Sequence, residues 1–477
     1  MCCRVSGNVY NYKAHQRVAR ERAVLKDGTR PEAIFSYRFI KLISLAFFFQ
    51  ICYSIKNALI LEIQMKLNPI ITSLLETDLY KFSMGQAIYH QFPSYKTRWT
   101  FKCRNQDVKF THEMVEEIKE QIHNYCSLRF NEDELAYLQT IEWLHEDYID
   151  HLQIWKPRFG DFEITEDSPC GLSINAIGTW LNTSMYEIPV LAIVNEVYFR
   201  MQYNYDELFE QYKRRLEEKK NWLVTGKYNL GPFSEFGLRR RLSAEAQELA
   251  VKVLTENNPN YKESKCVGTS NVYLAKKYKV LAVGTMAHEF IMCVGQGNPM
   301  YNPAYSNKLA MDAWTKEYGV LNGTYLTDTI GDETAHLDMG YTYSICFAGV
   351  RHDSGDPYKW GDEWIAHFQK YYDKYHDERV NPKSKTLLFS DSLDFERASA
   401  LYGYFKDKSK VAFGIGTYIA NDTDVPSLNI VMKVTECNNR PVAKLSNAGG
   451  KTMCEDDEYV EYLRKSIEWR LAHTHHK

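Results

Sequence analysis

The sequence contains little that would direct the protein to a membrane, to nucleic acid or to an oxidising compartment. Its main apolar run, Leu42–Ile55, has 14 residues, fewer than the roughly twenty that a membrane-spanning helix needs. The formal net charge of −3 over 477 residues gives no overall attraction to a polyanion. The 11 cysteines are scattered without a CxxC pair, which is typical of reduced thiols. We therefore expect a cytoplasmic globular protein without membrane or nucleic-acid partners.

Residues 1–66 differ in composition from the rest of the chain. Up to Ile40 they contain eight Lys or Arg and three acidic residues, and the apolar run follows. This run is a poor signal peptide, because its charged leader is long and no small-residue cleavage site follows. One interpretation is a transit or anchoring segment. We favour an untranslated leader in front of Met65 or a disordered extension, and a Western blot that detects the full-length native protein would contradict the leader.

The remaining sequence predicts two domains of different type. Residues 67–190 mix strand-like runs with amphipathic helices and lack a regular alternation, which predicts an α+β domain. Within 191–434, strand-like runs that end in a polar or glycine tip alternate with helical patterns in about seven or eight units. This pattern predicts an irregular (β/α) barrel with Leu428–Val434 as its last strand. A doubly wound sheet would also alternate, but no GxGxxG opens a helix. The segment 435–477 is predicted to join the first domain.

One strand tip carries a histidine. Val280–Val283 is a short apolar run typical of a buried strand, and Gly284 ends it. The following residues open a helix or loop, which places His288 and Glu289 just past the carboxyl end of the strand, where parallel α/β proteins bind ligands. A neutral histidine can act as a base, a ligand or a nucleophile. A single histidine near a strand is more often structural, so its role depends on the neighbouring tips.

Two later tips suit a phosphate. Ser390 and Ser392 follow one predicted strand, and Gly414, Gly416 and Thr417 follow the next. Glycine lets backbone N–H groups approach an anion closely, and hydroxyls add further donors. Late barrel strands are the usual position of such a site. Together the two tips favour phosphate binding.

Two further tips are rich in charge. Arg351 and Asp353 belong to a dense polar tip, in which a guanidinium can bind a carboxylate or phosphate at two points. The carboxylate there can bind sugar hydroxyls or a metal-bound pyrophosphate. The stretch Phe236–Arg241 places an aromatic ring beside three arginines. Adjacent helical residues point in different directions, so these arginines need not share one site.

Read in order, these tips resemble the nicotinate phosphoribosyltransferase family from about residue 68 to about residue 464. The motifs that carry the resemblance are Thr77-Asp-Leu-Tyr-Lys81, Phe236-Gly-Leu-Arg-Arg-Arg241, Gly268-Thr-Ser-Asn271, Gly284-Thr-Met-Ala-His-Glu289, Leu326-Thr-Asp328, Gly349-Val-Arg-His-Asp-Ser-Gly-Asp-Pro357, Phe389-Ser-Asp391 and Phe413-Gly-Ile-Gly-Thr417. The resemblance implies transfer of phosphoribose from phosphoribosyl pyrophosphate to nicotinate, coupled to ATP hydrolysis in NAD salvage. It also implies Mg²⁺, a two-domain fold and a site near the interface of a homodimer.

The resemblance also implies roles for individual residues. His288 would be phosphorylated by ATP, Asp353 would contact the ribose hydroxyls, and Glu289 or Asp328 would orient the imidazole. The implied substrate-binding residues are Tyr80 and Phe236 around the pyridine ring (with Tyr80 from the same chain or from a partner subunit), Arg239 and Arg351 near the carboxylate and pyrophosphate, Thr269 and Ser270 in the Gly268 motif, and Ser390, Ser392, Gly414, Gly416 and Thr417 around the 5′-phosphate.

Three alternatives remain open at this point. The first is an enzyme of the same scaffold that uses nicotinamide, which a competition between the two pyridines would distinguish. The second is a non-catalytic phosphosugar-binding barrel, which would keep the phosphate tips and lose the reactive histidine. The third is a histidine phosphocarrier, although no docking segment suggests one. The presence of His288, Asp353 and both aromatic residues argues against the second alternative.

Overall fold

The computed structural model describes residues 67–256, 264–446 and 454–474, so the predictions for residues 1–66 lie outside the described residues. Asn68–Lys477 form one compact unit. None of the helices described is both long and apolar enough to cross a membrane. The eight cysteines of the described residues are free thiols, and the cytoplasmic location stays a prediction.

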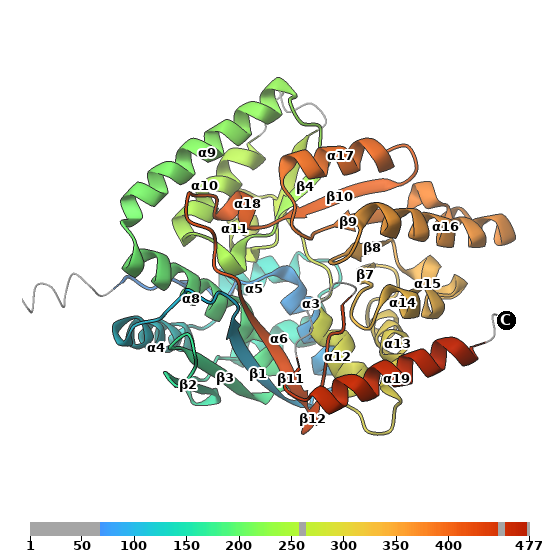
Figure 1. Cartoon of the computed structure of the whole chain (residues 1–477), viewed down its shortest axis with the longest axis horizontal. Helices are drawn as coiled ribbons and strands as arrows, with labels where there is room; N and C mark the ends of the chain where they lie inside the picture. Colours follow the sequence, from blue (N-terminus) through green and yellow to red (C-terminus); the bar gives the residue numbers. More distant parts are fainter. Residues whose placement is uncertain (1–66, 257–263, 447–453, 475–477) are drawn as a thin grey trace, which may run out of the picture. The chain divides into compact units, whose positions relative to one another are not determined.

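Seven parallel strands form a curved, open half-barrel (Figure 1). Their order is β6-β5-β4-β10-β9-β8-β7, and within the described residues no pairing joins β6 to β7. The irregular α/β barrel predicted from the sequence is therefore confirmed, with one side open. Its strands are β4 (Pro232–Glu235), β5 (Lys265–Thr269), β6 (Leu281–Ala282), β7 (Thr324–Leu326), β8 (Gly349–His352), β9 (Thr386–Phe389) and β10 (Lys410–Ile415).

The helices of the half-barrel follow the predicted alternation. Helices α10, α16 and α17 pack against β5, β8 and β10, respectively. The helices of the half-barrel part of the chain are α10 (Ala244–Thr255), α11 (Val272–Tyr278), α12 (His288–Gln296), α13 (Ser306–Tyr318), α14 (Asp332–Asp338), α15 (Tyr341–Cys346), α16 (Pro357–Tyr375), α17 (Phe395–Phe405) and α18 (Thr417–Ala420). Every residue of β8 is buried, Arg351 and His352 included, and the polar loop that begins with Asp353 follows directly after the strand.

Local caps keep the loops between strand tips and helices short. The carboxylate of Asp356 accepts hydrogen bonds from the backbone N–H groups of Tyr358 at 2.9 Å and Lys359 at 3.2 Å, and Pro357 occupies the first helical position of α16. Asp394 caps α17 in the same way. An aspartate at the N-cap satisfies backbone donors that a helix start leaves free. The caps therefore hold the polar tips near their strands.

The second sheet is antiparallel, with the order β12-β11-β1-β3-β2. Its strands are β1 (Lys96–Cys103), β2 (Phe162–Thr165), β3 (Ser173–Thr179), β11 (Ile430–Cys437) and β12 (Arg440–Pro441). The prediction that Leu428–Val434 forms the last barrel strand is wrong, because β11 pairs with β1 along Thr97–Cys103. The alternating burial of β11 suits a sheet with two different faces, whereas fully buried barrel strands lack this alternation.

Helices surround the antiparallel sheet and link it to the half-barrel (Figure 1). They are α3 (Leu79–Gln91), α4 (His112–Ser127), α5 (Glu132–Gln139), α6 (Glu146–Ile154), α7 (Trp180–Thr183) and α8 (Glu187–Gln202), with short 3₁₀ turns at Ser184–Tyr186 and Leu238–Arg240 among others. The next helix, α9 (Tyr205–Thr225), packs against α8 and α10. Helix α8 packs against α4, against β11 and against the turn Leu238–Arg240. This helix therefore connects the two sheets next to the predicted arginines.

The C-terminal helix α19 (Asp457–His473) packs on the half-barrel part of the chain. Its residues Tyr459, Leu463 and Ile467 form a buried cluster with Ala304 and Ile330. In addition, Arg470 forms an ion pair with Asp338 and donates to the carbonyl of Ala304 at 2.6 Å. The prediction that this helix packs back on the first domain is therefore wrong, although β12 does join the antiparallel sheet. The division into two domains itself stays a prediction.

Candidate active site

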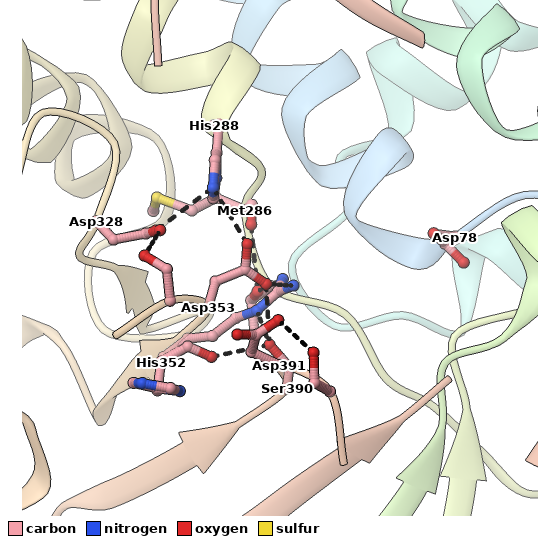
Figure 2. A network of polar contacts seen from close by, with 12 residues as sticks. Asp78, Met286, His288, Asp328, His352, Asp353, Ser390 and Asp391 are labelled. Carbon is pink, nitrogen blue, oxygen red and sulfur yellow. Dashed lines mark hydrogen bonds and ion pairs between the residues drawn. The ribbon is translucent and has the colours of Figure 1, made fainter. Parts of the chain in front are cut away.

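His288 occupies the first position of α12 and lies between two carboxylates, as Figure 2 shows. Its Nε2 is 3.3 Å from Asp328 Oδ1 and 3.3 Å from Asp353 Oδ2. Lys444 Nζ is 2.9 Å from Asp328 and 3.3 Å from Asp353. Burial and the nearby Lys444 ammonium hold the pKa of His288 well below its usual range. The imidazole is therefore neutral at pH 7 and keeps a nitrogen lone pair for chemistry.

Of the two carboxylates predicted to orient the imidazole, only Asp328 lies beside it. Glu289 bonds to other groups, because its oxygens accept from Lys81, from Trp180 Nε1 at 3.1 Å and from Ser184 Oγ. In contrast, Asp328 Oδ2 accepts from Ser354 Oγ at 2.6 Å, which fixes the carboxylate next to the ring. The prediction for Glu289 is thus corrected to a buried anchor, while Asp328 keeps the position next to His288.

Arg351 connects three strand tips. Its guanidinium donates to Ser390 Oγ at 2.8 Å, to Thr285 Oγ1 at 2.9 Å and to Asp353 Oδ1 at 3.3 Å. A planar guanidinium with five donors can hold several acceptors in fixed positions. The side chain of Asp353 remains 27% exposed. Arg351 therefore fixes Asp353 while leaving the carboxylate open to a ligand.

A small inner cavity of about 130 Å³ lies next to His288. Its wall includes Tyr80, Trp99, Glu187, Arg239 and His288. Tyr80 is supplied by the same chain, so the arrangement needs no partner subunit for this residue. The homodimer stays a prediction. A flat ring and one charged group match the size and the polar lining of this cavity.

A larger outer cavity of about 930 Å³ is lined by the predicted phosphate tips and shares several wall residues with the inner one. All five predicted phosphate residues line it: Ser390, Ser392, Gly414, Gly416 and Thr417. Phe236 also lines this cavity, and a Cβ on Gly414 would lie 2.3 Å from the Phe236 ring. Only glycine fits there, so the ring can lie against the backbone. Tyr80 and Phe236 line different cavities in this structure, and their predicted stacking around one ring stays a prediction.

Thr269 and Ser270 do not line either cavity. Thr269 is fully buried, and its hydroxyl donates to Glu235 Oε2 at 2.6 Å. Gln247 Nε2 donates to the same oxygen at 2.9 Å, and the backbone N–H of Gly237 donates to the other oxygen. Thr269 therefore supports the loop that carries Phe236, and its predicted contact with substrate is corrected accordingly. Ser270 is also buried and lies outside both walls.

Glu235 predicts a measurable pH dependence of stability. Burial raises the pKa of Glu235 to about 7, although the three hydrogen bonds that its carboxylate accepts act to lower it. The folded protein then binds this proton more tightly than the unfolded chain, so the free energy of unfolding falls as pH rises from about 4.5 to about 7. Glu235→Gln should remove about 2–3 kcal/mol of this fall between pH 5 and pH 8. Denaturant unfolding of the unmodified protein and of Glu235→Gln at several pH values in this range measures the difference. If the free energy of unfolding falls equally with pH in both proteins, the prediction is contradicted.

The sequence did not indicate three of the cations at the site, Lys433, Lys444 and Arg104, and it gave Arg240 only as one of the three arginines after Phe236. Lys433 and Lys444 line both cavities, and Arg104 and Arg240 line the outer one. Burial lowers the pKa of Lys433 to about 8 and that of Arg240 to about 10. A lysine inside the apolar strand β11 was the available signal for Lys433. The positions of the others depend on the pairing of distant strands, which the local pattern does not encode.

Comparison with known proteins agrees with the geometry. Residues 232–470 match the nicotinate phosphoribosyltransferase (NAPRTase) family, and residues 75–195 match the N-terminal domain of the same family. Nicotinate phosphoribosyltransferases of Herminiimonas arsenicoxydans and Cupriavidus necator are 39% and 40% identical, over 83% of this chain and 98% of theirs.

Solved structures give the same result. The nicotinate phosphoribosyltransferase of Porphyromonas gingivalis has a TM-score of 0.75 at 30% identity, covering 84% of this chain and 100% of that one. A putative nicotinate phosphoribosyltransferase of Saccharomyces cerevisiae has a TM-score of 0.76 at 32% identity, covering 85% of this chain and 100% of that one. The chain therefore belongs to the nicotinate phosphoribosyltransferase family.

Proposed function

We propose that this protein transfers the phosphoribosyl group of phosphoribosyl pyrophosphate to nicotinate and couples the transfer to ATP hydrolysis through a phosphohistidine at His288. The products are nicotinate mononucleotide, a precursor in NAD salvage, and pyrophosphate. The observation that carries the proposal is a buried histidine that lines a ring-sized cavity, whose wall shares Arg351 and Asp353 with a polar cavity lined by the predicted phosphate tips. Membership of the family supports the choice of substrates.

The transfer step needs positioning and charge stabilisation more than a base. The pyridine nitrogen already carries a lone pair, so it forms the bond to the ribose C1′ while the bond from C1′ to pyrophosphate breaks. Pyrophosphate leaves with the electron pair. The Asp353 carboxylate lies where it can bind ribose hydroxyls and stabilise positive charge that develops at C1′. Arg351 and Lys444 keep that carboxylate in place.

Nicotinate recognition follows from the inner cavity. Tyr80 and Trp99 offer apolar faces to a pyridine ring. Arg239 is the cation proposed for the carboxylate, because its guanidinium lines both cavities. This cation favours nicotinate over nicotinamide, whose amide is neutral. Ser390, Ser392 and the glycine tip offer donors to the 5′-phosphate.

Phosphorylation of His288 requires no prior loss of a proton from the nitrogen that reacts. The lone pair of the neutral ring forms an N–P bond with the γ-phosphorus of ATP, and the bond from that phosphorus to ADP breaks. Hydrolysis later transfers the phosphoryl group to water as inorganic phosphate. The phosphoryl group would sit at the N-terminus of α12, beside Lys444 and Arg351, where helix and side-chain charge are favourable to an anion.

The proposed Mg²⁺ fits the outer cavity better than the cluster around His288. His288, Asp328 and Asp353 lie close enough to share an ion, but the Lys444 ammonium already contacts both carboxylates. The outer cavity adds the carboxylate of Asp391, and oxygen ligands are those that Mg²⁺ prefers. When bound there, Mg²⁺ supplies positive charge to the polyphosphate groups of the substrates.

A direct assay tests the proposal. The purified protein is incubated with phosphoribosyl pyrophosphate, Mg²⁺, ATP and either nicotinate or nicotinamide, and the mononucleotides are detected by mass. We expect nicotinate mononucleotide, more of it with ATP than without, and little product from nicotinamide. Equal or greater product from nicotinamide would refute the substrate assignment. No product from either pyridine would favour a non-catalytic phosphosugar-binding protein.

A further inference from the structure

Lys81 lies directly behind the wall of the inner cavity and is fully buried. Its Nζ is 2.8 Å from Glu187 Oε2 and forms a second ion pair with Glu289. The ammonium also lies 4.7 Å from the centre of the Trp99 ring. Lys81 itself does not line the cavity, whereas Glu187, Glu289 and Trp99 all do. One buried cation therefore holds three parts of the wall, which come from α8, α12 and β1.

The two carboxylates that bind Lys81 differ in their remaining contacts. Glu289 is anchored on its second oxygen by Trp180 and Ser184. The second oxygen of Glu187 instead faces Arg239 Nη1 at 3.6 Å. Glu187 is thus shared between a close ammonium and a more distant guanidinium. Any change at Lys81 should therefore act on Glu187 and, through it, on Arg239.

Arg239 is held loosely. Its two carboxylate neighbours, Asp78 and Glu187, lie at 3.7 Å and 3.6 Å, longer than the roughly 2.7–2.9 Å of a charge-assisted hydrogen bond. Its side chain is 39% exposed. The guanidinium is thus balanced in charge, while its N–H groups remain able to bind an incoming carboxylate. A guanidinium in a close ion pair would first have to break that pair.

We propose that Lys81 is a positioning residue for nicotinate: it holds Glu187 away from Arg239 and so keeps the guanidinium available to the substrate carboxylate. This inference rests on the proposed function and names a determinant of its preference for the acid. Without the ammonium, Glu187 would have Arg239 as its nearest cation and would close onto it. The N–H groups of Arg239 would then be occupied before the substrate arrives.

The charge states of the buried groups agree with this arrangement. Burial alone would lower the pKa of Lys81, but Glu187 and Glu289 outweigh it and raise the pKa. Burial would raise the pKa of Glu187, but Lys81 and then Arg239 lower it. Both groups are therefore ionised at pH 7, and the contact between them is an ion pair rather than a neutral hydrogen bond.

The test compares Lys81→Met with the double variant Lys81→Met/Glu187→Gln. Methionine keeps the apolar length of lysine and removes the charge. We expect the KM for nicotinate to rise about tenfold in the single variant, the equivalent of one charged hydrogen bond. The KM for phosphoribosyl pyrophosphate and the kcat should each change by less than about threefold, which is well below the change expected for nicotinate. The double variant should recover most of the lost affinity, because a neutral amide does not capture Arg239.

Two further measurements separate positioning from structural damage. Inhibition by nicotinamide, a neutral molecule of the same shape, should be unaffected by Lys81→Met. If Lys81→Met does not fold, Glu187→Gln alone is expected to lower the KM for nicotinate, because it removes the competitor for Arg239. An unchanged KM for nicotinate in Lys81→Met, an equal loss of nicotinamide binding, or a double variant weaker than the single one would each overturn the proposal. Failure of the proposed function is distinct, since the unmodified protein would then form no mononucleotide.

Discussion

Replacing His288 by alanine is expected to abolish the phosphoprotein and the dependence of the reaction on ATP. Slow transfer without ATP should remain, because the inner and outer cavities are still present. The ATP-stimulated rate should fall by on the order of 100-fold, the size of effect seen when a group that acts in the transition state is removed. Incorporation of label from γ-labelled ATP and product formation with and without ATP measure the two effects.

The physical reason lies in the surroundings of the imidazole. His288 is neutral because burial and Lys444 lower its pKa, so a nitrogen lone pair is available at pH 7. Once phosphorylated, the residue would bring negative charge beside Asp328 and Asp353, and it would draw Lys444 and Arg351 toward itself. Such a charge change reorders nearby ion pairs. Alanine has no nitrogen lone pair to phosphorylate and brings no negative charge to these ion pairs.

His352 provides a matched control. It lies on β8, on the other side of Asp353 from His288 (Figure 2), and is also buried, but it packs against Trp360 and Phe389 and lines neither cavity. His352→Gln should keep both label incorporation and ATP stimulation, even if stability falls. ATP stimulation that survives in His288→Ala, or that disappears equally in both variants, would refute the role of His288.

Replacing Asp353 by asparagine is expected to reduce kcat/KM by about 10²–10³-fold, the usual loss when a preorganised electrostatic group is removed from an active site. Asparagine keeps the shape of the side chain and removes the negative charge that faces the ribose. The kcat should fall and the KM for phosphoribosyl pyrophosphate should rise, whereas the KM for nicotinate should change little. Steady-state kinetics with each substrate varied in turn measures this difference.

The fold should tolerate this change. Lys444 keeps Asp328 as a partner at 2.9 Å, and Arg351 keeps its bonds to Thr285 and Ser390. The melting temperature should therefore remain within a few degrees of the unmodified protein. Asp362→Asn, at an exposed carboxylate paired with Lys408, serves as the control and should leave kinetics unchanged. Activity of Asp353→Asn within about threefold of the unmodified protein would contradict the role of a preorganised charge there.

The local pattern predicted the strand tips well. The alternation of apolar runs and polar tips placed His288 at the start of a helix, and placed Asp353, Ser390 and Gly416 around the cavities. These predictions succeeded because parallel strands bring their carboxyl ends to one edge, whatever the rest of the chain does. The sequence could not distinguish a tip that faces the cavity from one that turns inward. Thr269 turns inward toward Glu235, and Glu289, which does line the inner cavity, is bound by Lys81 rather than by the imidazole.

The errors concerned strands and helices whose partners are distant in sequence. Leu428–Val434 has the composition of a barrel strand, but β11 pairs with β1 of the antiparallel sheet. Helix α19 has an amphipathic pattern that would suit several surfaces, and the fit of Tyr459, Leu463 and Ile467 against Ala304 and Ile330 decides between them. Burial of an apolar face is non-directional, so the pattern alone does not identify the partner surface.

The sequence by itself determined the alternation of strands and helices, the glycine and serine strand tips, and the histidine past a strand, because each depends on residues close together in the chain. The tertiary structure alone decided the charge around them. Lys433 and Lys444 reach the site through the pairing of β11 with β1 and the chain that follows, and Lys81 reaches Glu187 and Glu289 through the packing of separate helices. Electrostatic contacts depend on distance in space, and residues far apart in the chain supply most of them here.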